Sequence, residues 1–361
     1  MSFYRHISVF VFTSLALVAC DGTGTLLDLY PAKPIVNPET GVLIQDNRLI
    51  YAWLGTGGRI SGMTEKGGFT TSDHFRSFEF WPSSWFAGQH SVGFGSGLMA
   101  YAAVHGRAFV LHYSTDNGQS WATFDKPIVS EEQLLVGNVY AAKVVVGPQG
   151  IIWLLCEQSA GMSRRLLVYR VDVQEQTAKL SFLKEGASGV DVDFTDLEHG
   201  WLIYTEPQVP AGGIGVLYTT DGGAAWHDGG KLDGMQQAAI TAVDKRVLLV
   251  YHSDGRIFRS ADGGKTFQRV SAGASGVHDC QAANSRMVYA LLTDGVAKSE
   301  DGGQTWHALP AGTDGLPVSG KAIYFSTERR GIVYGDDRLF VTRNGGESWS
   351  VLVYPYEYVL Q

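Results

Sequence analysis

Short apolar runs in this chain repeatedly end at a polar turn that contains glycine. Val, Ile, Leu, Tyr and Phe dominate these runs, and an aromatic residue usually stands directly after the turn. Short runs without a helical period predict β-strands, and glycine allows the positive φ of a tight return. The pattern therefore predicts a series of β-hairpin corners. The clearest strands before these corners are Phe109–Tyr113, Val216–Tyr218, Ile257–Phe258 and Leu339–Val341.

The turns follow one eight-residue pattern, Ser/Thr-x-Asp-x-Gly-x-Ser/Thr-Trp. Good copies lie at Ser114–Trp121, Thr219–Trp226, Ser260–Phe267, Ser299–Trp306 and Thr342–Trp349. Asp and Asn side chains bond their own backbone in turns, so we expect this position to fasten the turn and not to bind metal or act in catalysis. These residues are Asp116, Asp221, Asp262, Asp301 and Asn344. The closing aromatics, which we expect to enter the core, are Trp121, Trp226, Phe267, Trp306 and Trp349.

This turn resembles the Asp-box, or BNR repeat, of sialidases and many other β-propellers. From Asp221 onward the copies are separated by 41, 39 and 43 residues, whereas 105 residues separate Asp116 from Asp221. One four-stranded blade takes about 40–45 residues, so the long interval holds a blade without a box, near Leu166–Phe182. Upstream, Thr71–Phe78 keeps an acidic residue, Asp73, at the expected step but lacks the glycine.

Five good boxes, one decayed box and one missing box predict an all-β, seven-bladed propeller over residues 41–361. Six or eight blades remain open, because the start of the first blade is poorly marked. The aromatic-rich segment 349–359 is expected to complete a blade with the N-terminal segment and so close the ring.

The first residues are typical of an export signal. Met1–Ala19 holds an apolar run that is too short for a good membrane span, and it ends at Leu17-Val18-Ala19-Cys20. This ending resembles the lipobox of bacterial lipoproteins, which implies that residues 1–19 are removed and that Cys20 is lipidated. An ordinary signal peptide with a chance cysteine is the alternative. Residues 20–40 then form a tether, and the propeller faces the periplasm from the inner or the outer membrane.

The net charge and the cysteines bear on which partners and cofactors the chain can bind. The formal net charge of −8 argues against nucleic acid. Cys156 and Cys280 are expected to be buried free thiols, because repeat counting places them in different blades. No cysteine–histidine cluster is visible, so neither a metal nor another cofactor is predicted.

A second resemblance lies between the boxes. Val192–Trp201 and Ile323–Gly335 share an apolar-x-Phe pattern followed by polar residues and a glycine. With the boxes, this resembles the photosystem II assembly and stability factor family over about residues 190–349. The resemblance implies a seven-bladed propeller and is weak evidence for function.

Two catalytic interpretations are open. A sialidase would need an arginine triad, for which Arg59, Arg107, Arg256 and Arg338 are the candidates, but three of these recur with the repeat and are expected to serve the blades. A glycosidase with two carboxylates could draw on the acidic stretch after residue 190. Its members are Asp191, Asp193, Asp196, Glu198 and Glu206. A solvated face is the alternative.

A separate binding surface is predicted where the chain departs from the repeat. The segment Phe78–Phe86 holds Trp81, Trp85 and Phe86 beside a proline and two serines. Exposed, these aromatics would contact protein or glycan; folded back, they would cover the propeller. Trp53, Trp153 and Trp201 lie in strand patterns and are expected in the core.

The sequence thus favours a non-catalytic, lipid-anchored envelope protein. Its propeller would bind another envelope or secreted protein, as an assembly or maturation factor or as an immunity protein. The alternative is a glycan-active or glycan-binding propeller, so enzymatic activity stays open.

Overall fold

The computed structural model describes residues 49–353 with short gaps, together with residues 19–20 and 26–27. The gaps are 55–58, 65–66, 73–78, 83–90, 95–97, 106–107, 117–119, 127, 129–137, 161–162, 207–211, 236, 274–275, 311–320 and 336–337. Most of the predicted signal and tether therefore lies outside the described residues. Cys20 belongs to β1 (Ala19–Cys20), which pairs antiparallel with β2 (Leu26–Leu27).

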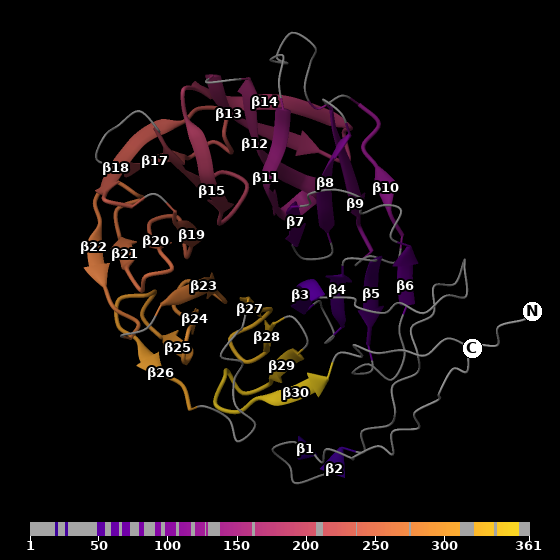
Figure 1. Ribbon diagram of the computed structural model, residues 1–361, viewed down its shortest axis with the longest axis vertical. Coiled ribbons are helices and arrows are strands. Elements are labelled where there is room, and N and C mark those ends of the chain that lie inside the picture. Colours follow the sequence, from indigo (N-terminus) through magenta and orange to yellow (C-terminus); the bar gives the residue numbers. More distant parts are fainter. Residues whose placement is uncertain are drawn as a thin grey trace, which may run out of the picture.

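The remaining strands form a ring of blades around a central axis (Figure 1). Within the described part of the chain there are seven four-stranded antiparallel sheets, each built from four consecutive strands. The first strand of each blade lies nearest the axis and the fourth lies at the rim. The predicted all-β propeller is confirmed. The seven blades of the described residues match the number that the spacing of the turns favours.

Three blades precede the second half of the chain. Blade 1 comprises β3 (Leu49–Leu54), β4 (Ile60–Thr64), β5 (Gly67–Thr71) and β6 (Glu79–Pro82). Blade 2 comprises β7 (Ser91–Phe94), β8 (Met99–His105), β9 (Ala108–Ser114) and β10 (Ala122–Thr123). Blade 3, which has no box, comprises β11 (Asn138–Val146), β12 (Ile151–Ala160), β13 (Ser163–Asp172) and β14 (Thr177–Glu185), with a 3₁₀ turn, η4 (Pro148–Gly150), between its first two strands.

Four blades with boxes follow. Blade 4 comprises β15 (Ser188–Phe194), β16 (Gly200–Thr205), β17 (Gly213–Thr219) and β18 (His227–Asp233). Blade 5 comprises β19 (Ala239–Ala242), β20 (Leu248–Tyr251), β21 (Ile257–Ser260) and β22 (Gln268–Val270). Blade 6 comprises β23 (Val277–Ala282), β24 (Val288–Leu292), β25 (Gly295–Ser299) and β26 (His307–Ala308). Blade 7 comprises β27 (Ala322–Phe325), β28 (Gly331–Tyr334), β29 (Arg338–Thr342) and β30 (Ser350–Val353).

Apolar clusters between neighbouring blades form the core. Between blades 3 and 4, for example, Trp153 and Leu155 pack against Val192 and Leu202 from the next blade. Trp153 and Trp201 are almost completely buried, and each indole Nε1 donates to a carbonyl in the next blade's box. Burial of these large apolar faces holds each blade against its neighbour.

The recurring phenylalanine and glycine have a packing role. Phe194 stacks on Trp153 with ring centroids 3.7 Å apart and also lies over Gly200, where an added Cβ would stand 2.3 Å from the ring. In blade 7, Phe325 lies over Gly331 in the same way, at 2.6 Å. Glycine is needed because any side chain would displace the aromatic ring from the junction between blades.

The ring closes by packing of blade 1 against blade 7. In the described residues, β30 pairs with β29 inside blade 7, and Ala52 and Leu54 contact Ile332 and Tyr334 across the junction. The expectation that the last strand completes a blade with the N-terminal segment is therefore wrong for these strands. Among the described residues, apolar contacts close the ring and no strand is exchanged between blades 1 and 7.

Candidate functional site

The Asp-box turns join the third and fourth strands of their blades. In blade 6, the Asp301 carboxylate accepts hydrogen bonds from Ser299 Oγ, Thr305 N and Thr305 Oγ1 at 2.8, 2.8 and 2.5 Å. Gly302 and Gly303 have φ values of 70° and 83°, which side chains rarely adopt. Burial would raise the pKa of Asp301, but the hydrogen bonds outweigh it and lower the pKa to about 2. This carboxylate is committed to its own turn.

The same bonds recur in the other described boxes. Their central side chains are Asp116, Asp221, Asp262 and Asn344. Burial of Asp262 is outweighed by hydrogen bonds from Thr266 and Ser260, so its pKa also falls to about 2. Asp73 of the decayed box lies outside the described residues. Each described box carboxylate thus serves local structure.

The closing aromatics lie at the junctions between blades. Trp226 donates from Nε1 to Ser181 Oγ in blade 3 at 3.0 Å and meets the Phe194 ring edge-on. Trp349 is buried against Phe325. The other three, Trp121, Phe267 and Trp306, are partly buried.

Most of the predicted aromatic segment Phe78–Phe86 lies outside the described residues. Trp85 and Phe86 lie outside them, and Trp81 belongs to β6 without a described side chain. Cys20 and Trp53 are likewise described only as strand residues. Contacts of these side chains stay a prediction.

A polar cavity of about 400 Å³ lies at the centre of the ring, between the inner strands of blades 3 to 6. Lys143, Asp193 and Asp279 line it, together with Thr241, Gln281 and Tyr251. A β-bulge precedes Lys143 in β11, Asp191 in β15 and Asp279 in β23. A bulge adds a residue and redirects the side chains that follow, so one local device brings these charges toward the axis.

The cavity carboxylates bind backbone amides of the next blade. Ile240 N donates to Asp191 at 2.9 Å, and Ala242 N donates to Asp193 at 2.9 Å. Asp191 also forms an ion pair of 2.5 Å with Lys143 of the preceding blade. This single carboxylate therefore joins blades 3, 4 and 5.

The arrangement repeats two blades further on. Asp279 Oδ2 accepts from Ile323 N at 3.0 Å, and Asp279 Oδ1 accepts from the Tyr251 hydroxyl at 2.9 Å. Phe325 N donates to the Gln281 side chain, and Thr241 Oγ1 donates to Cys280 O. Side-chain hydrogen bonds thus link blades 4 to 7 around the cavity.

Burial dominates the titration of the cavity acids. It raises the pKa of Asp279 to about 6 against the lowering effect of hydrogen bonds from Ile323 and Tyr251. It also raises the pKa of Asp193, although Lys143 opposes that shift. Burial lowers the pKa of Lys143, but Asp191 and Asp193 outweigh it and raise the value overall.

The acidic stretch of blade 4 does not form one site. Asp191 and Asp193 face the cavity region, whereas Asp196 caps a hairpin turn through Glu198 N and His199 N. Glu206 pairs with Lys184 of blade 3 at 3.1 Å. Sequence reasoning missed Lys143, Tyr251 and Asp279, and no motif in the sequence marks these three residues.

Of the arginines considered for a sialidase, the two with described side chains, Arg59 and Arg256, do not line the cavity. Arg256 donates to Asp254 at 2.7 Å in an exposed turn. Arg107 lies outside the described residues, and the side chain of Arg338 is not described. The described lining of the cavity includes no arginine.

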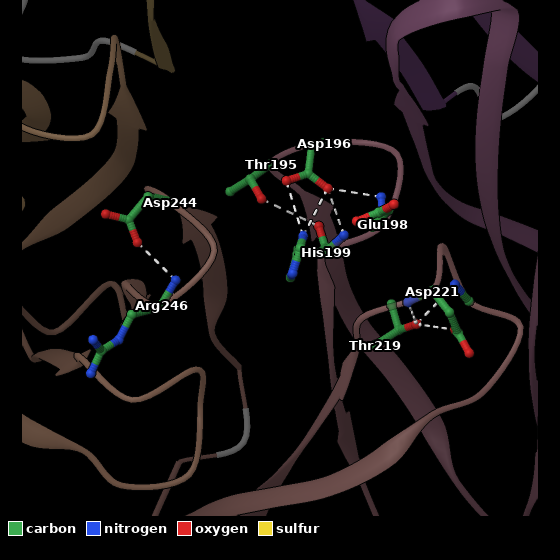
Figure 2. Close-up of polar contacts among 9 residues, drawn as sticks. Thr195, Asp196, Glu198, His199, Thr219, Asp221, Asp244 and Arg246 are labelled. Carbon is green, nitrogen blue, oxygen red and sulfur yellow. Dashed lines mark hydrogen bonds and ion pairs between the residues drawn. The ribbon is translucent and has the colours of Figure 1, made fainter.

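A second hollow, a groove of about 530 Å³, lies between blades 4 and 5 on the side of the boxes. Figure 2 shows the turns beside it: Asp196 faces the backbone N–H of His199, Thr219 bonds Asp221, and Asp244 accepts from Arg246 N. The Arg246 guanidinium extends away from Asp244. These Asx turns place the side chains around the groove on rigid corners.

Two further findings concern only the described residues. None of their helices is long and apolar enough to cross a membrane. No group of three or more His, Cys, Asp or Glu side chains among them is arranged to hold a metal ion.

Comparison with known proteins agrees with this geometry. A BNR/Asp-box repeat matches residues 112–123. No curated sequence matches the chain. Among solved structures, the chain is similar to YCF48 from Cyanidioschyzon merolae, with a TM-score of 0.54 and 17% identity over 84% of this chain and 97% of that one.

Two further solved structures are similar over most of this chain. YCF48 bound to D1 peptide has a TM-score of 0.57 and 14% identity, over 88% of this chain and 96% of that one. PorZ, a surface component of the type-IX secretion system of Porphyromonas gingivalis, has a TM-score of 0.56 and 11% identity, over 86% of this chain and 39% of that one. At these identities the likeness shows a shared propeller fold.

Proposed function

We propose that this chain is a non-catalytic propeller that binds another protein. The observation that carries the proposal is that the acids in and beside the central cavity are engaged in structure. Asp191, Asp193 and Asp279 each accept a hydrogen bond from a backbone N–H of the next blade. A general base needs a lone pair aimed at substrate, and both oxygens of each of these carboxylates already accept a hydrogen bond within the protein.

The structural likeness supports the same proposal. One similar propeller is YCF48 bound to D1 peptide, a propeller holding a segment of protein. Propellers present turns from several blades on one face, and such rigid turns are suited to contacts with a partner. The role proposed for this chain is assembly or maturation of an envelope protein; an immunity protein that blocks a toxin is a variant of it.

The proposed location is the cell envelope. Residues 1–19 act as an export signal, Cys20 carries the lipid, and residues 20–40 tether the propeller on the periplasmic side. Several acyl chains on one residue would give stable anchoring. This part of the proposal rests on the sequence ending Leu17-Val18-Ala19-Cys20.

Crosslinking in intact cells tests the function. The full-length, lipid-anchored protein is crosslinked in its native envelope, purified under denaturing conditions and analysed by mass spectrometry. The expected result is one strongly enriched envelope or secreted protein, with crosslinks on a single face of the ring. Recovery of only abundant envelope proteins, in proportion to their abundance, would contradict the proposal.

Glycan binding or cleavage is the second candidate. It is favoured by the position of Asp193 and Asp279 on one cavity, where burial raises the pKa of both carboxyls. A raised pKa suits a general acid. The test is a screen of envelope and host glycans with the purified protein and with Asp193→Asn. Turnover that is lost in the variant would establish this candidate in place of the first.

A further inference from the structure

The groove between blades 4 and 5 has a wall of cations beside an aromatic floor. We propose that this groove binds an acidic segment of the partner protein, with carboxylates against the cationic wall and a neighbouring apolar side chain on the floor. The inference rests on the proposed function and names the chemistry of the contact.

The wall comes from blade 5. Lys245 and Arg246 lie at the exposed tip of its first hairpin turn, and Lys265 lies in its Asp-box. No described carboxylate forms an ion pair with any of these three cations. Because these cations form no ion pair with a described carboxylate, they can form ion pairs with carboxylates of another protein. Their charge also speeds the encounter with an acidic partner.

One carboxylate, that of Asp262, lines the groove, and its charge is already engaged. It accepts hydrogen bonds from Ser260 Oγ, Thr266 N and Thr266 Oγ1. The groove therefore carries an excess of positive charge on a chain whose formal net charge is −8. An acidic segment would be repelled by the rest of the surface and attracted here, which gives the contact its specificity.

The floor comes from blade 4. Trp201 lies beneath the groove, almost completely buried and fixed by the bond from Nε1 to Gly263 O at 3.0 Å, so Tyr218 supplies the exposed part of the floor. Tyr218 is partly buried, with Lys265 Nζ 5.7 Å from its ring centroid and His227 at 5.3 Å on centroids. A partly exposed ring with Lys265 over it, in a groove that Lys245 and Arg246 also line, suits a Glu or Asp that is followed by an aliphatic or aromatic residue.

The geometry favours a peptide over a phosphate group. Phosphate sites on proteins usually gather several backbone N–H groups at one point. Here the N–H groups of Lys265 and Thr266 already donate to Asp262. A volume of about 530 Å³ accepts a few side chains of an extended segment. On the opposite rim, Asp196 is held by His199, so the acidic segment is expected to run along blade 5.

The test uses the full chain and a fluorescent peptide in which Glu alternates with Tyr. Lys245→Glu, Arg246→Glu and Lys265→Glu are combined in one variant. The matched control combines Lys179→Glu, Lys231→Glu and Arg269→Glu, three exposed cations on the outer strands of blades 3 to 5. Both variants change the net charge equally. Peptide binding is measured by fluorescence anisotropy at low and at near-physiological salt.

The proposal predicts a loss of affinity of about tenfold or more in the groove variant and a change of less than about twofold in the control. Binding of the wild type should weaken as salt increases, and a peptide with Lys in place of Glu should not bind. Equal losses in both variants, or competition by inorganic phosphate or anionic vesicles at matched charge, would overturn it.

The two proposals fail in different ways. If crosslinking recovers a partner that the groove variant retains fully, the groove is wrong and the function stands. If neither protein recovers a partner, the function itself is wrong. Circular dichroism and thermal unfolding of both variants exclude a folding defect as the cause of lost binding.

Discussion

Replacement of Asp279 by asparagine should change how the stability of the ring depends on pH. Asp279 is partly buried at the junction of blades 5, 6 and 7 and carries a pKa of about 6 in place of the ordinary 3.8. Between about pH 4 and about pH 6, the Asp279 carboxyl therefore keeps its proton in the folded protein and has lost it in the unfolded chain. Stability from this group is complete below about pH 4 and falls as the pH rises to about 6.

The size of the effect follows from the pKa difference. A difference of about 2 corresponds to about 3 kcal/mol between the two limits. The amide in the Asp279→Asn variant cannot ionise, so the free energy of unfolding of the variant minus that of wild type should rise by about this amount between about pH 4 and about pH 7. Subtracting wild type from variant at each pH cancels the contributions of the other titrating groups. These include the box carboxylates, whose lowered pKa values make stability fall with decreasing pH.

The assay is urea unfolding of the full chain, followed by tryptophan fluorescence at half-unit steps of pH. Tyr251→Phe serves as a second variant, because its hydroxyl donates to Asp279 and lowers the pKa of that carboxyl. Its loss should move the midpoint of the pH effect upward. A flat difference between Asp279→Asn and wild type across this pH range would refute the reasoning about burial.

Three other changes test separate parts of the account. Gly200→Ala should destabilise the fold by about 1–3 kcal/mol in thermal or urea unfolding, since its Cβ would stand 2.3 Å from Phe194; an unchanged midpoint would show that the ring can move away. Lys143→Met should cost about 1–3 kcal/mol by the same assay, because it leaves the buried Asp191 without a cation that is itself one third exposed; a neutral result would mean that the N–H groups of Val192 and Ile240 satisfy the carboxylate. Cys20→Ala should release the protein from the membrane fraction in cell fractionation, because the lipid attachment residue is gone; retention at wild-type level would contradict the lipid anchor.

The repeat made most of the fold predictable. The box turns mark the corner between the third and fourth strands, so their spacing indicates blade size even where one box is lost. The blade near Leu166–Phe182 could be placed by counting alone, because a ring of blades tolerates no gap. Closure of the ring was not predictable, since the apolar packing of Ala52 and Leu54 on Ile332 has no marker in the sequence.

The central cavity was much harder to anticipate. Asp191 and Asp193 look like members of an acidic loop, but the structure places them on an inner strand, where they bond the next blade. Lys143 stands in an apolar strand of the box-less blade, and Asp279 belongs to no motif. Their equivalence depends on a β-bulge before each residue, and a bulge shifts the register by a single residue that the hydrophobic pattern does not reveal.

The mass of the native complex tests the central claim most directly. The lipid-anchored protein is extracted from its own envelope with a mild detergent, purified by a C-terminal tag, and measured by native mass spectrometry. The account predicts a species that contains this chain and one other protein in a fixed ratio. A protein that is recovered only as the free chain after in-cell crosslinking would contradict a protein-binding role.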